Sequence, residues 1–170
     1  ARRLTIALSR PCATVQHMKN VRGFTLVELM VTMAVAVVLL SMAVPSFTEM
    51  IRNSRMTAQA NDLITALNLA RSESIKRGTQ VQVAASGGGW ANGWNVQLTD
   101  ATVLRTFSAI SSGYTLTEEG GLTTLTYDST GRVTAAASFA LCDSQRTGET
   151  GRTISILITG RISVTNLSCS

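Results

Sequence analysis

An apolar run of 21 residues, 24–44, most constrains what this chain can fold into. Its one charged residue is Glu28, and a short basic segment ending in Arg22-Gly23 stands directly before it. As an α-helix the run would be about 31 Å long, enough to cross a bilayer hydrocarbon core of about 30 Å. A carboxylate in a spanning helix costs roughly 2.5–3.5 kcal/mol on insertion scales, so Glu28 should have a partner. The nearest one would be the α-amine created by cleavage between Gly23 and Phe24.

This junction, Gly23-Phe-Thr-Leu-Val-Glu28-Leu, resembles the class III leader of type IV prepilins and of type II secretion pseudopilins. In that family a prepilin peptidase cuts after the glycine and methylates the new N-terminal phenylalanine. The glutamate five residues into the mature chain pairs with the N-terminus of a neighbouring subunit. The resemblance therefore implies cleavage between Gly23 and Phe24, N-methylation of Phe24 and an assembly role for Glu28. The alternative is an ordinary membrane anchor with an incidental glutamate.

Charge is distributed unevenly along the chain. Five of the 15 basic residues precede the junction, and no acidic residue does; the five are Arg2, Arg3, Arg10, Lys19 and Arg22. From Phe24 onward the basic and acidic side chains balance at ten each, so the formal net charge of +5 belongs to the leader. Because positive residues flanking a spanning helix stay in the cytoplasm, we expect a cytoplasmic leader and a periplasmic head at the bacterial inner membrane.

The leader is expected to comprise residues 1–23, of which residues 1–17 are excluded from the fold prediction. Met18 begins a six-residue leader of a length that this family often uses. The stretch before it is interpreted as a genuine extension, an upstream start or vector-derived sequence. His17, the only histidine, lies in that stretch and carries no ligand or catalytic hypothesis.

The helix is expected to continue beyond the membrane. Residues 24–45 are its predicted transmembrane part. Residues 46–77 place apolar side chains at helical spacing and charged ones on the remaining surface, which predicts an amphipathic second part. Pro45 removes a backbone donor and crowds the preceding turn, so a kink or local interruption is expected there. Gly78 is the expected end of the helix.

Residues 78–170 have the pattern of a β-rich head. Short alternating segments bounded by turn residues predict strands at residues 79–85, 95–99, 104–107, 114–117, 122–127, 132–134, 138–142, 152–158 and 161–164. A long N-terminal helix followed by short antiparallel strands is an α+β architecture. The resemblance further implies the type IV pilin fold, in which the second half of the helix packs on an antiparallel head.

Looser motifs in the head narrow the resemblance to the GspH/FimT family of minor pilins and pseudopilins, including FimU-like proteins. They are Trp90…Gly93-Trp94-Asn95-Val96, Gly131-Arg132-Val133, Phe139…Cys142 and Gly160-Arg161…Cys169. Trp90 and Trp94 could form a stacking platform for a carbohydrate. The simpler interpretation is that two large aromatics at a hairpin bury area and hold the sheet to the helix.

Three cysteines need an account. Cys12 would be lost with the leader, which leaves Cys142 and Cys169 in the mature chain. Outside the cytoplasm such a pair is expected to oxidise, and the disulfide would stabilise the head by about 2–4 kcal/mol. Two buried free thiols are the alternative, and a zinc site is disfavoured because no histidine is available.

Enzymatic chemistry is not expected. The mature sequence has no histidine, no phosphate-binding glycine loop, no nucleophile elbow and no metal-ligand spacing. We expect no cofactor and no metal, and the chain is interpreted as a substrate of the peptidase and not as an enzyme.

Three functions are compatible with these features. The first is a minor pilin, a structural or priming subunit of a type IV pilus that contacts other pilins through its N-terminal helix. The second is a DNA-binding minor pilin for natural transformation. Some relatives bind DNA through a C-terminal Gly-Arg-x-Arg motif. The corresponding residues here are Gly160-Arg161-Ile-Ser163, so the second arginine of the motif is absent. A basic patch could still form from Arg132, Arg146, Arg152 and Arg161. The third is a minor pseudopilin of a type II secretion system.

Overall fold

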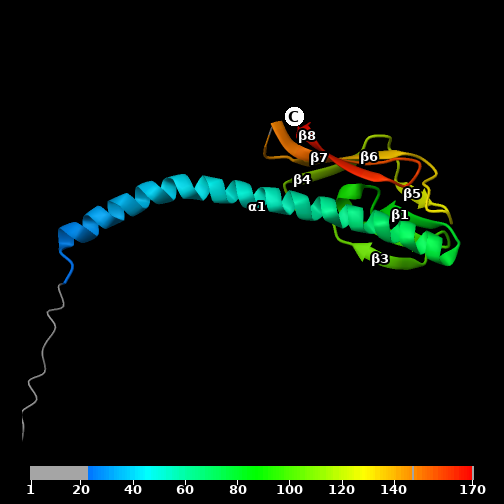
Figure 1. Ribbon diagram of the computed structural model, residues 1–170, viewed down its shortest axis with the longest axis horizontal. Coiled ribbons are helices and arrows are strands. Elements are labelled where there is room, and N and C mark those ends of the chain that lie inside the picture. Colours follow the sequence, from blue (N-terminus) through cyan, green and yellow to red (C-terminus); the bar gives the residue numbers. More distant parts are fainter. Residues whose placement is uncertain (1–22, 147, 170) are drawn as a thin grey trace, which may run out of the picture. The chain divides into compact units, whose positions relative to one another are not determined.

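The computed structural model describes residues 23–146 and 148–169 (Figure 1). The leader residues 1–22, including Cys12, Met18 and Arg22, lie outside the described residues. One helix, α1 (Leu26–Arg77), is followed by eight strands and a short 3-10 turn, η1 (Trp90–Asn92). The chain divides into two compact units after Ala43, and α1 contributes to both.

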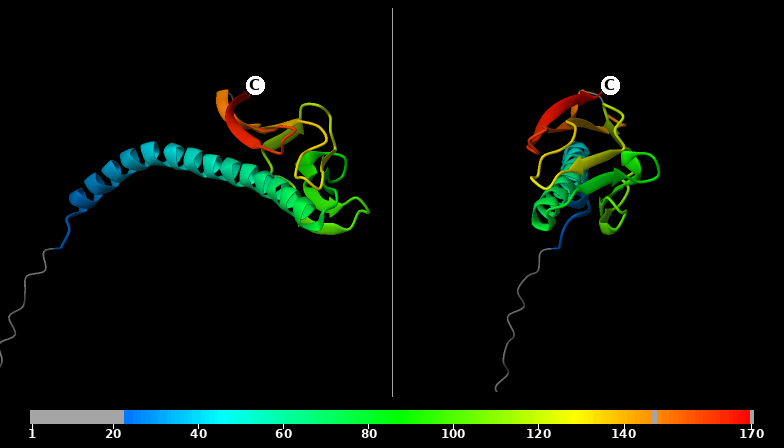
Figure 2. Two further views of the ribbon diagram at one scale, coloured as in Figure 1. Left: turned by 45° about the vertical axis from the view of Figure 1, so that its right-hand side comes forward. Right: turned by 90° about the vertical axis from the view of Figure 1, so that its right-hand side faces the viewer.

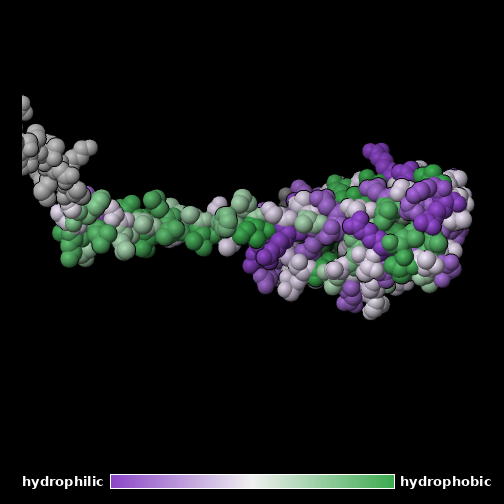
Figure 3. Space-filling view, turned by 90° about the horizontal axis from the view of Figure 1, so that it is seen from below, coloured by the Kyte–Doolittle hydropathy of each residue, from purple (hydrophilic) through white to green (hydrophobic). Residues whose placement is uncertain are grey.

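In the first unit, residues 23–43, the helix is exposed on all sides and its surface is apolar (Figure 3). By length and composition α1 contains a stretch that could cross a membrane. Its hydroxyl groups are satisfied locally, since Thr32 and Ser41 donate to the carbonyls of Leu29 and Val38. A hydroxyl bonded within its own helix can enter an apolar environment at low cost.

In the second unit, α1 buries one face. Residues spaced three or four apart are packed away from solvent: Met56, Gln59, Ala60, Leu63, Ala66, Leu67, Ala70 and Ser74. The helix includes Pro45, and the kink expected there stays a prediction. It ends where the sequence indicated, because Gly78 adopts a left-handed φ of 64° and its N–H donates to the carbonyl of Ile75.

Two four-stranded antiparallel sheets form the rest of the head. The first has the order β3-β2-β1-β5, with β1 (Val81–Ala85), β2 (Trp94–Leu98), β3 (Val103–Phe107) and β5 (Thr124–Tyr127). The second has the order β4-β6-β7-β8, with β4 (Tyr114–Glu118), β6 (Ala137–Asp143), β7 (Gly148–Ile156) and β8 (Ile162–Cys169). In the end-on view the strands lie around one side of the C-terminal part of α1 (Figure 2).

One hydrophobic cluster joins the helix to both sheets. The cluster includes Leu63 and Leu67 of α1 together with Val83 and Val96 of the first sheet. Phe139 of the second sheet belongs to the same cluster, and all five side chains are fully buried. Burial of this apolar area is the main force that holds the head together.

The two tryptophans belong to this core. Trp90 contacts the ring of Phe139 edge-on at 4.7 Å, and its indole N–H donates to the carbonyl of Leu122. Trp94 stacks on Phe107 at 5.9 Å. Only 5% of Trp90 and 1% of Trp94 is exposed, so the interpretation as buried packing residues is confirmed and a carbohydrate platform is excluded.

Most predicted strands lie within two residues of the observed ones, but β7 begins at Gly148 and ends at Ile156, whereas the prediction was residues 152–158. The expected strand at residues 132–134 was wrong: Val133 makes a single bridge to Tyr127, while its N–H donates to Ile158. A segment whose successive bonds go to different partners cannot extend a ladder. The last strand was underestimated, because β8 continues to Cys169.

Candidate functional site

The predicted cleavage junction begins the described chain. Phe24 is 79% exposed, and Glu28 lies in the first turn of α1. The backbone N–H of Glu28 donates to Oγ1 of Thr25 at 3.2 Å, so Thr25 caps the helix. Sequence reasoning missed this cap, although the spacing Thr25-x-x-Glu28 is that of a capping box. The negative charge of Glu28 also suits the positive end of the helix dipole.

The helix surface at residues 24–44 is apolar and exposed. Its large side chains are each between 54% and 79% exposed; they are Phe24, Leu26, Val27, Leu29, Met30, Val31, Met33, Val35, Val37, Val38, Leu39, Leu40, Met42 and Val44. A soluble monomer rarely exposes so large an apolar area, so this surface requires lipid or protein neighbours.

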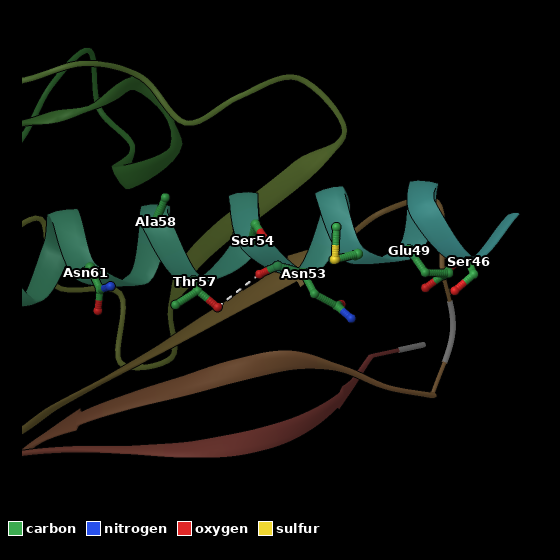
Figure 4. A pocket seen from close by; sticks show the side chains of 8 residues that line it. Ser46, Glu49, Asn53, Ser54, Thr57, Ala58 and Asn61 are labelled. Atoms are coloured by element: carbon green, nitrogen blue, oxygen red, sulfur yellow. Dashed lines mark hydrogen bonds between the residues drawn. The ribbon is translucent and has the colours of Figure 1, made fainter. Parts of the chain in front are cut away.

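A shallow groove of about 710 Å³ follows one face of α1 in the second unit (Figure 4). Met50 and seven small or polar side chains line it; the seven are Ser46, Glu49, Asn53, Ser54, Thr57, Ala58 and Asn61. The hydroxyl of Thr57 donates back to the carbonyl of Asn53 at 2.9 Å. All of the lining residues belong to one face of α1, so the groove is an open helix surface and not an enclosed site for a small ligand.

Arg146, in the turn between β6 and β7, connects the second sheet to α1. Its Nε donates to Oδ2 of Asp143 at 2.8 Å, and one Nη donates to Glu49 at 2.6 Å and to Asn53 at 3.1 Å. Arg52 lies 3.5 Å from the same Asp143 oxygen. This group of residues, Glu49, Arg52, Asn53, Asp143 and Arg146, is called the arginine clamp below.

Electrostatics in the arginine clamp favour the charged forms. Burial alone would raise the pKa of Asp143, but the backbone N–H of Gln145 and the guanidinium of Arg146 outweigh it, so the pKa lies below its ordinary value. Burial alone would lower the pKa of Arg146, but its bonds to Glu49 and Asp143 raise it. The clamp is therefore a structural ion-pair network at neutral pH.

The disulfide between Cys142 and Cys169 is present, as expected. It joins β6 to the end of β8 and encloses the whole β7–β8 hairpin. Gly151 of β7 lies against it, because a Cβ at this position would collide with Sγ of Cys169 and would lie 2.9 Å from the carbonyl oxygen of Leu141. The bond thus fixes the C-terminal strand to the body of the head.

The four candidate DNA-binding arginines do not form one patch. Arg146 is only 12% exposed and is ion-paired in the arginine clamp. Arg152 is half-buried and donates to the carbonyl of Gly151. Arg132 and Arg161 are exposed in two separate turns.

These two turns lie against each other. A Cβ on Gly160 would collide with the carbonyl oxygen of Gly131, and both glycines have positive φ. Arg71 of α1 donates to the carbonyl of Thr159 beside them. Gly160 is therefore explained by close approach to the backbone of Gly131. Gly131 is explained by its own positive φ of 78° and by the side chain of Ile75, whose Cδ1 would lie 2.7 Å from a Cβ.

Comparison with known proteins decides the family. Residues 59–160 match the family model described as type II transport protein GspH. The chain belongs to the GspH family. Residues 18–44 match the prokaryotic N-terminal methylation motif. No match is found among curated proteins.

Solved structures show the same fold. The type IV minor pilin FimU of Pseudomonas aeruginosa strain PAO1, in a P21 crystal, is 24% identical and has a TM-score of 0.59, over 66% of this chain and 89% of that one. Its P65 crystal form is also 24% identical, with a TM-score of 0.57, over 64% and 91%. The predicted type IV pilin fold is confirmed. As a member of the GspH family, the chain is a structural subunit of a type IV pilus or of a type II secretion system.

Proposed function

We propose that the chain is a minor pilin, processed between Gly23 and Phe24 and assembled into a type IV pilus through α1. The observation that carries this proposal is the apolar helix surface at residues 24–44, whose one charge is Glu28. Such a surface fits lipid before assembly and the helices of other subunits afterwards.

Glu28 would direct the transfer of the subunit from the lipid bilayer into the fibre. A buried carboxylate gains most from a partner of opposite charge, and the methylated α-amine of a neighbouring subunit would supply it. Small side chains on α1 would allow close approach of the neighbouring helix; they are Thr32, Ala34, Ala36, Ser41 and Ala43. The local bonds of Thr32 and Ser41 leave no unsatisfied hydroxyl at that contact.

Before assembly, we place the chain in the bacterial inner membrane with its leader in the cytoplasm and its head in the periplasm. The positive charges before Gly23 support this orientation. The disulfide between Cys142 and Cys169 supports an oxidising compartment for the head. Processing would be tested by mass spectrometry of the membrane-extracted protein, with an N-terminal methylated Phe24 as the expected result.

Replacement of Glu28 tests the assembly role. We expect Glu28→Gln, produced in a pilus-bearing host, to be inserted and cleaved normally but to be depleted at least several-fold from sheared fibres. Thr25→Val is the matched control, because it removes the helix cap and keeps the carboxylate. Normal incorporation of Glu28→Gln, or equal depletion of Thr25→Val, would contradict an assembly role for the charge.

The family description supports a pseudopilin as a second candidate. Deletion of the gene separates the two functions. We expect loss of pilus-dependent surface motility with normal export of secreted enzymes; the reverse result would assign the chain to a type II secretion system.

DNA binding is a third candidate, and the adjacent turns that carry Arg132 and Arg161 support it. Gel-shift assays of the mature chain in detergent at two salt concentrations would test it, because phosphate contacts weaken steeply with salt. Arg132→Ala with Arg161→Ala should abolish a salt-sensitive shift, whereas Arg55→Ala, an exposed arginine on α1, should not. Absence of a shift at low salt removes this function.

A further inference from the structure

A small polar pocket of about 210 Å³ lies beside α1, next to the arginine clamp. Arg52 and Arg55 of α1 form one wall of it. The remaining lining comes from the start of β4 with the loop before it, and from the end of β6 with the turn after it; these residues are Ser112, Gly113, Tyr114, Asp143 and Gln145. The pocket belongs entirely to the second unit of the chain.

Contacts among α1, β4 and β6 hold this pocket in place. The hydroxyl of Tyr114 donates to the carbonyl of Arg52 at 3.1 Å, which joins the start of β4 to the helix. The hydroxyl and the backbone N–H of Ser144 both donate to the carbonyl of Gly113 at 2.9 Å. Gly113 has a φ of 87°, a conformation that glycine adopts without strain. The pocket is therefore a built feature of the head.

The two arginines of the pocket lack a full counter-charge. Arg146 engages both carboxylates of the arginine clamp, because it donates to Glu49 at 2.6 Å and to Asp143 at 2.8 Å. Arg52 lies further from Asp143, at 3.5 Å. Arg55 is exposed, and its side chain has no ion pair or hydrogen bond within the described parts of the chain. An anion in the pocket would supply the missing charge, and the planar donor fork of a guanidinium suits a phosphate.

The pocket follows closely after the end of the apolar run. Val44 and Arg52 both belong to the second unit and are eight positions apart in one helix, which is a rise of about 12 Å. Phe47, Met50 and Ile51, all exposed, continue the apolar surface between them. The headgroup layer of a bilayer is about 5–7 Å thick on each side, and a long arginine side chain can extend back toward it. When α1 spans a membrane, the guanidinium of Arg52 is therefore expected near the level of the lipid phosphates.

We propose that Arg52 and Arg55 bind the phosphate of an acidic phospholipid in the membrane that holds the subunit before assembly. This inference rests on the proposed anchoring through α1 and adds to it the class of lipid. A zwitterionic phospholipid carries the same phosphate together with a cationic group, which the two arginines repel. Binding of the acidic lipid would hold the head at the bilayer surface until the subunit enters the fibre.

Other anions fit less well. Free phosphate has the same chemistry as the lipid headgroup, but it lacks the acyl chains that keep a lipid beside the helix. An extended polyanion such as DNA would need a continuous basic track, whereas Glu49 and Asp143 adjoin this pocket. Arg55 is therefore not expected to contribute to DNA binding at Arg132 and Arg161.

Native mass spectrometry of the mature chain tests the proposal. The chain is extracted from membranes in a nonionic detergent and mixed with equal amounts of phosphatidylglycerol and phosphatidylcholine that carry the same acyl chains. We expect the phosphatidylglycerol adduct to be several-fold more abundant. The mass of the protein in the same spectra shows whether Phe24 is the methylated N-terminus, so a failure of lipid binding can be told apart from a failure of the proposed processing.

Variants and a competing anion decide the outcome. Arg55→Gln should lower the preference for phosphatidylglycerol at least twofold, and the additional change Arg52→Gln should bring the two adducts close to equal abundance. Lys76→Gln is the matched control, because its side chain is 76% exposed on the last turn of α1, and it should keep the preference. The fluorescence of the two buried tryptophans would show whether each variant is folded, and Arg55→Gln decides alone if the double variant is not.

Four results would overturn the proposal. They are equal adducts of the two lipids in the unmodified chain, an unchanged preference in Arg55→Gln, the same loss in Lys76→Gln, and displacement of phosphatidylglycerol by an equimolar amount of inorganic phosphate. The last result would assign the pocket to free phosphate and not to a lipid.

Discussion

Arg146 and Asp143 form an ion pair that is almost completely buried, with 2.8 Å between Nε and Oδ2 and side-chain exposures of 12% and 2%. Through Glu49, which lies 97 positions earlier in the sequence, the same guanidinium ties the turn between β6 and β7 to α1. The arginine clamp and the neighbouring disulfide thus both lie at the open end of the hairpin formed by β7 and β8, where Gly148 pairs with Cys169. We therefore expect the stability of β7 and β8 to depend on both the arginine clamp and the disulfide.

We expect Arg146→Met to destabilise the head by about 3 kcal/mol. Removing one partner of a buried ion pair leaves the other charge buried and costs roughly 3–5 kcal/mol, and Arg52 still faces Asp143 at 3.5 Å, which places the loss near the lower limit. Unfolding in guanidinium chloride, followed by the fluorescence of the two buried tryptophans, would measure the loss. Glu49→Gln is the control, because Glu49 is 56% exposed and its ion pair should contribute less than about 1 kcal/mol. Equal losses in the two variants would contradict this assignment.

Asp143 should make the head less stable as the pH falls. Its pKa in the folded state lies below its ordinary value of 3.8, because the N–H of Gln145 and the charge of Arg146 outweigh the effect of burial. The stabilisation is therefore fully present above about pH 4 and is lost as the pH falls through the folded-state pKa. Measurements of the free energy of unfolding from about pH 6 to about pH 2, which spans the ordinary aspartate pKa, should show a smaller acid-dependent loss in Asp143→Asn than in the unmodified chain. Parallel pH curves would exclude Asp143 as the group responsible.

Much of the fold could be predicted because its signals are local. The length of the apolar run, the helical spacing after Pro45 and the end at Gly78 each depend on neighbouring residues. The disulfide could be predicted because removal of the leader leaves two cysteines. Capping by Thr25 was equally predictable, because Thr25-x-x-Glu28 has the spacing of a capping box.

The remaining features arise from contacts between distant segments. Arg146 was a candidate for DNA binding because its sequence neighbours do not reveal Glu49 as a partner. The extent of β8 was missed because its polar, exposed residues lack the alternation that marks a half-buried strand. The pocket beside Arg52 and Arg55 forms only when Tyr114 of β4 lies against α1. No periodicity in the sequence encodes these pairings.

Gly160→Ala should destabilise the head more than Gly78→Ala. Both glycines have positive φ, so alanine is strained at either position by roughly 1 kcal/mol. A Cβ at Gly78 meets nothing within 4 Å, whereas one at Gly160 collides with the carbonyl oxygen of Gly131. We expect an additional loss of about 1–3 kcal/mol in Gly160→Ala, measured as the difference between the two unfolding free energies. Equal losses would show that the two turns separate without cost.

Gly151 and the disulfide should be energetically coupled. Loss of the bond in the Cys142→Ser, Cys169→Ser variant should cost about 2–4 kcal/mol. Gly151→Ala should cost about 1–3 kcal/mol in the unmodified chain, because its Cβ would lie 3.2 Å from Sγ of Cys142 and would collide with Sγ of Cys169. In the serine background both sulfurs are replaced by smaller oxygens and the bond that holds them is gone, so the alanine should cost less there. Unfolding free energies of the four proteins form a double-mutant cycle. A coupling of zero would mean that the contact with Leu141, and not the disulfide, requires glycine at this position.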